Sequence, residues 1–375
     1  MGRKVYLGTN LINDTYVGLD KTNLPSTRIV LASYVVAAGG GGGGVAGGGG
    51  GAGEVATNYL TGSTFPLIAA NYTVTVGDGG LGGAYITSSK PIVDNLNLGS
   101  GSNGYSSSIV SNLNAIYAEG GGGGSGIYST ASQQPTGSDG GSGGGSYALA
   151  PGGTSTATAY GRDGGTTDSV GVPAYTGSYT GSAPSQSNSY KDIPGGGGGV
   201  FEATGSNFIN SQFTYEVTDN NSHWFWSTNN DGASFSQEGM GGFGGEPLTV
   251  DYNPYNSGEV GAGGGGGGAG LTNSQYLDGG QGGGNTGGNG GGNINGQAGY
   301  NPAKTGSAYS GAGGGGGAFI RFFGNPFYFD GADGGSGIVV IKYELPQKYE
   351  GGELYYSGSD VLHVFTASGE LTSII

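Results

Sequence analysis

The sequence predicts a mainly β or irregular fold with almost no α-helix: a sandwich of polyglycine-II helices with short flanking β-strands. Two observations lead to this prediction. Glycine accounts for 93 of the 375 residues and is concentrated in uninterrupted runs, and β-branched segments recur between the runs. Polyglycine II has three residues per turn and no internal hydrogen bonds, so its amides pair only with neighbouring helices. We expect it in five runs: Gly39–Gly44, Gly120–Gly124, Gly195–Gly199, Gly263–Gly268 and Gly313–Gly317.

The glycine runs carry a large entropic cost. Each ordered glycine is less favourable than alanine by about 0.5–1 kcal/mol, which gives an upper bound on the order of 50–90 kcal/mol for the chain. Dense hydrogen bonding between closely packed runs would offset this cost, because glycine permits close approach. The runs are therefore expected to be lattice elements rather than linkers. The residues expected to act as scaffold are Gly41, Gly122, Gly197, Gly265 and Gly315.

The other residues favour an ordered protein. The chain has 25 tyrosines and 13 phenylalanines, whereas disordered chains are poor in aromatic residues. Three β-branched segments are expected to be strands: Ile29–Leu31, Tyr72–Val76 and Ile338–Ile341. Only 10% of the residues are charged, so uncharged polar side chains and backbone amides must cover the surface, as is common in extracellular fibrous and virion surface proteins.

Charge and composition exclude several classes of partner. The formal net charge of −15 argues against nucleic acid, which requires a basic surface, and against attraction to anionic lipid. Cysteine is absent, which excludes disulfides and thiolate chemistry.

Arg3 and Lys4 are not followed by the apolar region of a signal peptide. The longest apolar stretch, residues 29–38, is far shorter than the roughly 20 residues that span a bilayer. Assembly in a host cytoplasm followed by lytic release fits this pattern.

Three segments are expected along the chain. Residues 1–27 contain two short strand-turn units and form either a β attachment piece for another virion component or simply an ordered strand pair. Residues 28–342 alternate glycine runs with polar, aromatic-bearing loops, whose composition is typical of turns. Residues 343–375 regain an ordinary composition and contain strand candidates around Leu354–Tyr356 and Val361–Phe365.

Several motifs together resemble the glycine-rich tail-fibre and adhesin domains of tailed bacteriophages. The resemblance covers most of residues 28–369 and rests on the order of the motifs. In chain order, five stretches look like that module's strand leading into polyglycine, its Y-T-V-T-V-G-x-G-G element, its middle element, its closing element and its H-x-F-T-x-S-G strand. The last strand normally opens the module but here follows the closing element. The stretches are Arg28–Gly53, Tyr72–Gly80, Gly104–Ser108, Gly334–Tyr343 and His363–Gly369.

The resemblance implies a polyglycine-II sandwich core, as in the distal tail-fibre adhesins of T-even-like phages. In those proteins the glycine-rich segments are the scaffold and the intervening loops determine receptor specificity. The corresponding variable segments of this chain are Tyr85–Asn103, Tyr147–Asp192, Phe201–Glu238, Asn273–Tyr309 and Phe319–Phe329.

Catalytic, metal-binding and cofactor signals are weak. The two histidines, His223 and His363, lie far apart in sequence, and no G-x-S-x-G elbow or Walker A loop is present. The G-x-G-x-x-G matches are expected by chance, because about a quarter of the positions are glycine. Asp-Gly steps recur without the ligand spacing of calcium loops and are better explained as ordinary turns. We therefore expect no enzyme activity, no metal site and no cofactor.

Aromatic clusters are the strongest candidates for a binding surface. Two interpretations remain open: the rings cap a lattice that is poor in side chains, or they form a receptor-binding face, where Tyr, Trp and Arg are favoured. The segment around both tryptophans is the better candidate, because strongly polar residues precede it. The candidate binding residues are His223, Trp224, Phe225, Trp226, Tyr252, Tyr255, Arg321, Phe323, Phe327 and Tyr328.

Taken together, the sequence predicts a non-enzymatic virion protein at a tail-fibre tip that binds a host surface glycan or outer-membrane protein. The alternative is a purely structural fibre or decoration protein that contacts other virion proteins through residues 1–27 or the C-terminal segment. A third interpretation, glycan cleavage, needs two carboxylates about 5–10 Å apart, for which the chain offers only scattered candidates. Both a monomer and a homotrimer are compatible with the sequence.

Overall fold

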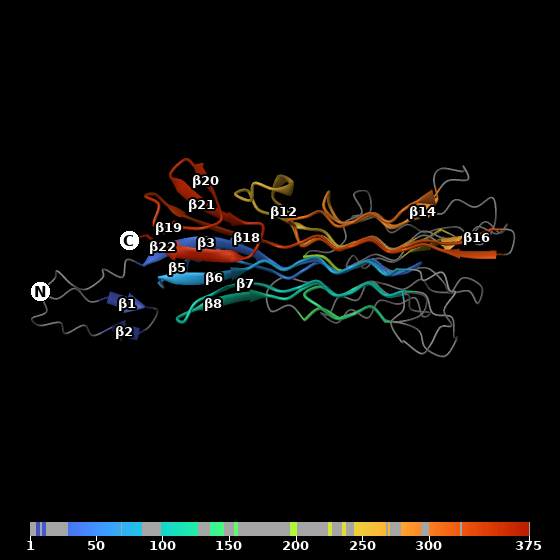
Figure 1. Ribbon diagram of the computed structural model, residues 1–375, viewed down its shortest axis with the longest axis horizontal. Helices are drawn as coiled ribbons and strands as arrows, with labels where there is room; N and C mark the ends of the chain where they lie inside the picture. Colours follow the sequence, from blue (N-terminus) through green and yellow to red (C-terminus); the bar gives the residue numbers. More distant parts are fainter. Residues whose placement is uncertain are drawn as a thin grey trace, which may run out of the picture.

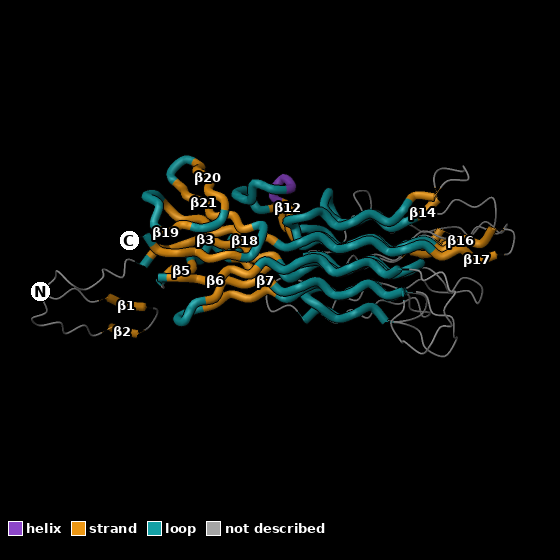
Figure 2. The backbone as a smooth tube through the Cα atoms, in the orientation of Figure 1, coloured by secondary structure: helices purple, strands orange, loops and turns teal. Residues whose placement is uncertain are grey.

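The computed structural model has an elongated shape, with β-sheets at one end and glycine-rich segments extending from them (Figures 1 and 2). Strands β1 (Val5–Leu7) and β2 (Asn10–Ile12), near the start of the chain, and strand β22 (Gly369–Ser373), near its end, lie at the sheet-containing end (Figure 1). The structure describes residues 5–7, 10–12, 29–68, 70–84, 99–126, 136–145, 154–156, 196–200, 224–226, 235–237, 244–267, 269–270, 279–293, 300–322 and 325–374.

Two antiparallel sheets form a sandwich at this end. The order of the six-stranded sheet is β20-β21-β18-β3-β4, with β5 also paired to β3; the order of the five-stranded sheet is β19-β22-β6-β7-β8. The first sheet consists of β20 (Glu353–Ser357), β21 (Asp360–Phe365), β18 (Ile338–Glu344), β3 (Val30–Ala37), β4 (Val55–Thr57) and β5 (Phe65–Leu67). The second consists of β19 (Tyr349–Glu350), β22 (Gly369–Ser373), β6 (Asn71–Thr75), β7 (Ser107–Val110) and β8 (Ala115–Ala118).

The main hydrophobic core joins strands of both sheets. Val36 and Ile341 of the six-stranded sheet belong to the same buried cluster as Tyr72, Ile109 and Leu371 of the five-stranded sheet. In β6 the exposed and buried residues alternate, as expected for a strand with one face in the core. The opposite face of the six-stranded sheet carries a second cluster, which is covered by the hairpin of β11 (Leu248–Thr249) and β12 (Glu259–Val260).

The glycine run that follows β3 is hydrogen-bonded with a period of three residues. The N–H groups of Gly39 and Gly42 donate to the carbonyl oxygens of Tyr105 and Ser102, at 2.9 and 3.0 Å. Gly40 and Gly41, which lie between them, donate to two other segments. Each of these segments accepts a further bond from the residue three positions later in the run. A three-residue repeat with no bond inside the run is the arrangement that three residues per turn would give.

Six segments surround this run. It donates to residues 99–105, 331–337 and 47–53, which run antiparallel to it, and accepts from residues 77–83, 120–126 and 312–317, which run parallel to it. All six N–H groups and all six carbonyl groups of Gly39–Gly44 are bonded in this way, and all six residues are buried. We call these packed runs, together with residues 138–145, 197–200, 244–246, 261–267 and 279–291, the glycine lattice.

Close packing in the lattice requires glycine. A Cβ atom on any residue of Gly39–Gly44 would lie less than 3.0 Å from the backbone of a neighbouring run. The five glycines expected to act as scaffold have the same environment. A Cβ atom there would meet the carbonyl oxygens of Gly122, Ser138, Gly50, Gly280 and Asn289, for Gly41, Gly122, Gly197, Gly265 and Gly315 respectively.

The mainly β and irregular fold class is confirmed. Within the described ranges the helical content is one 3-10 turn, η1 (Asn256–Gly258), and none of it is long and apolar enough to cross a membrane. The assignment of the runs to polyglycine II stays a prediction, which the three-residue hydrogen-bond repeat supports. The remaining small sheets are β1 (Val5–Leu7) with β2 (Asn10–Ile12), β9 (Trp224–Trp226) with β10 (Phe235–Gln237), β13 (Ala269–Gly270) with β16 (Phe319–Phe322) and β17 (Asn325–Tyr328), and β14 (Gly292–Asn293) with β15 (Tyr300–Asn301).

The C-terminal segment contributes to both sheets of the sandwich. Strand β18 continues across the expected boundary between residues 342 and 343. The strand with the H-x-F-T-x-S-G pattern is β21, which lies between β18 and β20. The strand after it, β22, pairs with β6 in the other sheet. The tail is therefore part of the same β-sandwich as β3 and β6.

Candidate functional site

The outer end of the lattice, away from the sheets, is where the chain leaves and re-enters the runs. Outgoing runs reach this end at Gly83 and Gly317, whose N–H groups bond to the carbonyl oxygens of Gly43 and Gly44. Returning runs begin there, because Val45 donates to Gly99 and Ala46 donates to Phe329. Residues 84–98 and 318–328 therefore connect runs whose ends lie at the outer end.

Four predicted binding residues fall within the connection 318–328, and three of them, Arg321, Phe327 and Tyr328, belong to the strands of a hairpin. Arg321 of β16 lies opposite Pro326 of β17, and Phe327 lies opposite Ile320. The side chain of Tyr328 is half-buried and packs against Val45 and Ala46 at the outer end. The side chains of Arg321 and Phe327 lie outside the described part of the structure, as does Phe323.

The tryptophan segment forms a second hairpin. Trp224–Trp226 is strand β9, and Trp226 lies opposite Phe235 of β10. The segment departs from the lattice after Val200, which is buried in the cluster on the six-stranded sheet, and re-enters at Gly244. His223 and the side chains of Trp224, Phe225 and Trp226 lie outside the described residues.

Tyr252 and Tyr255 lie beside the six-stranded sheet, near β12 and away from the β16–β17 hairpin (Figures 1 and 2). The structure therefore does not gather the predicted residues into one surface. The two tyrosines belong instead to a cluster that sequence reasoning did not assemble. We call it the tyrosine face, and it consists of Tyr59, Tyr252, Tyr255, Tyr309 and Tyr355.

The turn η1 positions Tyr255. Asn256 and Ser257 have positive φ angles of 51° and 55°, which residues other than glycine adopt infrequently. Asn256 Nδ2 donates to the carbonyl oxygen of Ala308 at 2.8 Å, which ties the turn to the neighbouring loop. As a result, the rings of Tyr255 and Tyr309 meet edge to face, with centroids 5.2 Å apart.

A carboxylate joins the tyrosine face to the edge strand β20. The hydroxyl groups of Tyr255 and Tyr355 both donate to Glu353 Oε2, each at 2.9 Å. Hydrogen bonding with Tyr355 and Glu353 raises the pKa of the Tyr255 hydroxyl well above its usual value. Each hydroxyl donates its single proton to Glu353, so the two tyrosine oxygens are presented as oriented hydrogen-bond acceptors next to exposed aromatic surface.

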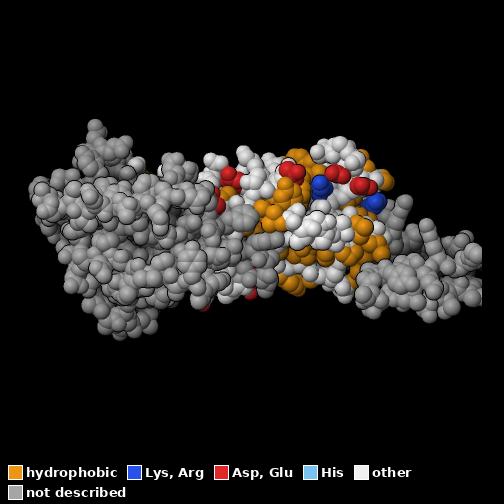
Figure 3. Space-filling view, turned by 180° about the vertical axis from the view of Figure 1, so that it is seen from behind, with side chains coloured by type: hydrophobic (Ala, Val, Ile, Leu, Met, Phe, Trp, Pro, Cys, Tyr) orange, Lys and Arg blue, Asp and Glu red, His pale blue; other side chains and the backbone are white. Residues whose placement is uncertain are grey.

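Tyr252 is the more deeply placed of the two predicted tyrosines. Its ring meets that of Tyr59 edge to face at 5.7 Å, and Lys342 Nζ lies 4.8 Å from its centroid. Lys342 also pairs with Asp360 at 3.4 Å. Burial raises the pKa of the Tyr252 hydroxyl above the range of physiological titration. Acidic and basic side chains lie close together on the sheet-containing end in Figure 3.

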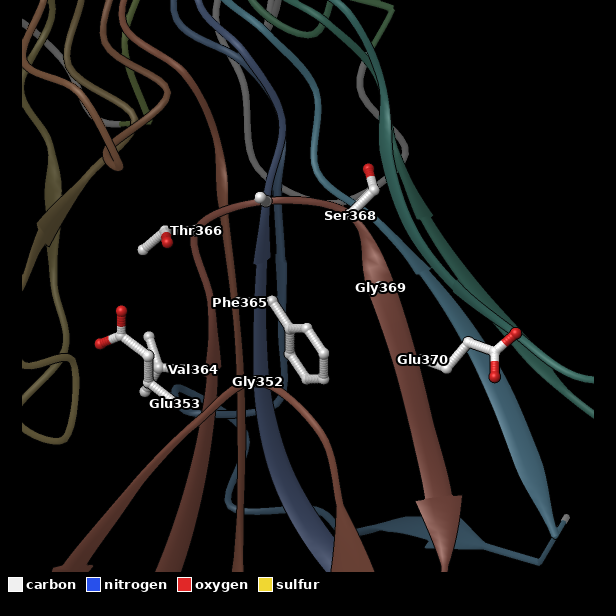
Figure 4. Close-up of a pocket in the computed structure, with 9 residues that line it drawn as sticks. Gly352, Glu353, Val364, Phe365, Thr366, Ser368, Gly369 and Glu370 are labelled. Atoms are coloured by element: carbon white, nitrogen blue, oxygen red, sulfur yellow. The ribbon is translucent and has the colours of Figure 1, made fainter.

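A shallow hollow of about 210 Å³ lies beneath the turn that joins β21 to β22. Figure 4 shows Glu353 and Glu370 on opposite sides of it, with Phe365 between them. Glu353 is already engaged by two tyrosine hydroxyls, and Ser368 Oγ accepts the N–H of Val76 at 3.0 Å. The hollow therefore adjoins the tyrosine face and is not a deep cavity enclosing a ligand.

In the described part of the chain, the carboxylates of two Asp-Gly steps accept hydrogen bonds from backbone N–H groups. Asp333 Oδ1 accepts the N–H of Gly82 at 2.6 Å, and Asp139 Oδ1 accepts the N–H of Thr154 at 2.7 Å. Both bonds hold distant backbone segments, 251 and 15 residues away, rather than the local turns that the sequence predicted for these steps. Among the residues that the structure describes, no three His, Cys, Asp or Glu side chains are grouped as metal ligands.

Comparison with known proteins matches one family model, described as a glycine-rich domain, over residues 21–344. No curated protein and no solved structure matches the chain. The match covers the glycine lattice and the sheets up to the end of β18, which is most of the chain. The protein therefore belongs to the glycine-rich domain family.

Proposed function

We propose that this protein is a bacteriophage tail-fibre tip or adhesin that binds a host cell-surface receptor through loops held on the glycine lattice. One observation carries the proposal: outgoing and returning runs alternate, and the runs joined by residues 84–98 and 318–328 end at the outer end, opposite the sheets. An elongated scaffold with loops at one end and attachment at the other suits a receptor-binding tip.

The hydrogen bonding of the lattice explains why such loops could be held firmly. Gly39–Gly44 is bonded to six other segments, so the ends of each connection are fixed by several backbone bonds. Binding loops on a fixed scaffold lose less entropy when they bind, because less chain has to be ordered. The lattice can therefore tolerate sequence change in the loops without loss of the fold.

The partner we propose is a host surface glycan or an outer-membrane protein, because aromatic side chains on loops suit both. We assign attachment to other virion proteins to residues 1–27 or the C-terminal segment, since strands β1 and β22 lie opposite the outer end of the lattice. The proposed location is the virion, after assembly in the host cytoplasm. We propose no enzymatic role and no nucleic-acid partner, in keeping with the net charge of −15.

Binding of the purified, labelled protein to a panel of bacterial cells and envelope fractions tests this function. The decisive variant replaces residues 84–98 with a Gly/Ser segment of equal length, and the matched control replaces the exposed Leu113 in the β7–β8 turn at the sheet end. We expect the loop variant to lose binding and the control to keep it.

Absence of binding to every envelope fraction would contradict the adhesin role and favour a structural virion component. Immunolabelling of particles separates these two functions, because an adhesin must be exposed at a distal tip. Release of reducing ends from host polysaccharide would show instead that the protein cleaves glycans.

A further inference from the structure

The boundary of the glycine lattice poses a chemical problem that its interior does not. A run in the interior bonds to other runs in every direction, whereas a run at the boundary has N–H groups that face no further run. Such unpaired backbone groups are a template for pairing with another chain, as they are at the edge of a β-sheet. A lattice without side chains has few ways to prevent this.

The run 77–83 shows how one boundary is closed. Gly80 and Gly83 donate to the carbonyl oxygens of Gly40 and Gly43, which belong to the central run, Gly39–Gly44. Leu81 and Gly82, which face other directions, instead donate to side chains: to Ser102 Oγ at 2.7 Å and to Asp333 Oδ1 at 2.6 Å. Both acceptors belong to the two runs that flank 77–83.

The run 120–126 is closed in the same way. Gly121 and Gly124 donate to the central run, while Gly123 and Gly126 donate to Asn103 Oδ1 at 2.9 Å and Ser100 Oγ at 3.2 Å. The two donors are three residues apart, and so are the two acceptors. The three-residue period of the lattice is thus continued by side chains where no further run is present.

A third boundary repeats the pattern. Gly282 donates to Asn289 Oδ1 and Gly284 donates to Glu246 Oε2, each at 2.9 Å. Ser102, Asn103, Asp333 and Asn289 are themselves exposed, so these side chains lie on the surface of the lattice. We call the six acceptors Ser100, Ser102, Asn103, Glu246, Asn289 and Asp333 the capping residues.

We propose that the capping residues terminate the glycine lattice: they occupy its boundary N–H groups and so prevent a second copy of this chain from adding its own glycine runs. The proposal explains why polar residues stand at these boundary positions in glycine-rich segments. It predicts that any oligomer of the native protein forms through surfaces other than the capped sides of the lattice.

The test removes caps and measures self-association. The variant Ser100→Ala/Asn103→Ala/Asp333→Ala frees the N–H groups of Gly126, Gly123 and Gly82, and the matched control carries Asp251→Ala and Asn301→Ala, which lie outside the runs. Light scattering coupled to gel filtration over a range of concentrations should show new, larger species for the capping variant. The control and the wild-type protein should share one size distribution.

Amide hydrogen exchange distinguishes lattice extension from unfolding. In the single variant Asp333→Ala, exchange at Gly82 should rise by about two- to tenfold, the effect of losing one hydrogen bond. Exchange at Gly80 and Gly83 should be unchanged, because their acceptors are backbone carbonyls. A capping variant that keeps the wild-type size distribution would overturn the proposal, and so would association accompanied by loss of protection at Gly80 and Gly83.

Discussion

Tyr343 Oη lies 2.8 Å from His363 Nε2, and the bonds around this pair fix the state of both side chains. The tyrosine oxygen accepts the N–H groups of Lys348 and Tyr349, at 3.1 and 3.0 Å, so its own proton is directed to His363. On the other side of the ring, His363 Nδ1 lies 2.7 Å from the carbonyl oxygen of Gly351, which can only accept. The histidine is therefore neutral, with its proton on Nδ1.

This arrangement predicts a stability that depends on pH. His363 is fully buried, and burial lowers its pKa below the usual value of 6.5. Below pH 6.5 the unfolded chain takes up a proton that the folded chain resists, so stability is complete above about pH 6.5 and falls as the pH decreases towards the pKa of the folded state. Urea denaturation from pH 5 to pH 8 should show this fall.

The control for this prediction is the other histidine. The variant His363→Gln should lose most of the pH dependence between pH 5 and 7, whereas His223→Gln should retain it. An unchanged slope in the His363 variant would show that other groups cause the effect.

Removal of the side-chain hydroxyl should lower stability much more at Tyr343 than at Tyr252. Tyr343→Phe removes the acceptor of two backbone N–H groups and the donor to His363, which should lower the free energy of unfolding by about 1–3 kcal/mol. Tyr252→Phe removes a buried hydroxyl that makes no hydrogen bond of good geometry, since the hydroxyl of the neighbouring Thr57 donates to the carbonyl oxygen of Tyr34, and it should change stability by less than about 0.5 kcal/mol. Equal losses in the two variants, measured by urea denaturation, would contradict this assignment.

Substitution within the lattice should be far more costly than substitution outside it. In Gly41→Ala the new methyl group meets the carbonyl group of Gly122, so we expect a loss of at least about 1–3 kcal/mol. Valine at Gly265 or Gly315 should abolish soluble folding. The control is Gly369→Ala, where the new Cβ atom would lie 3.5 Å from Phe365, an ordinary contact. Normal melting of the lattice variants would refute close packing there.

The tryptophan hairpin gives a prediction about attachment. Replacing Trp224 and Trp226 with alanine should weaken binding to host cells by about tenfold or more, or about 1.4 kcal/mol, with little change in the thermal midpoint. If these rings are instead buried, the loss of stability should reach about 3–5 kcal/mol. Tyr117→Ala, at a 61% exposed position on β8, is the control and should affect neither measurement. Intact attachment by a stable double variant would exclude the hairpin from the binding face.

The strands were predictable where β-branched or aromatic residues cluster. The segments around Ile338–Ile341, Leu354–Tyr356 and Val361–Phe365 are strands β18, β20 and β21. The partner of β22 could not be predicted, because its pairing with β6 joins residues 369–372 to residues 71–74, which are distant in sequence. The three-residue spacing of Gly331, Gly334 and Gly337 was not recognised in the sequence. These glycines face inward, and Asp333 between them caps the N–H of Gly82.

The candidate site was less predictable than the fold. Composition singled out Tyr252 and Tyr255, but their association with Tyr309, Tyr355 and Glu353 depends on the η1 turn and the edge strand β20. The carboxylate that joins them is 98 residues from Tyr255 along the chain. Spacing in sequence carries no signal for such a contact.

The central run, Gly39–Gly44, also determines how late in synthesis the hydrogen bonds of the lattice can be completed. Gly40 leaves the ribosome early, yet the carbonyl group that it requires, on Gly335, follows about 300 residues later. At about 5–20 residues per second, the wait is roughly 15–60 s. During that interval the N–H groups of Gly40 and Gly43, whose acceptors are on Gly335 and Ala332, have water as their partner, so the bonding of the run is completed only late in translation. A ribosome that stalls before residue 335 would therefore release a chain that lacks its innermost hydrogen bonds.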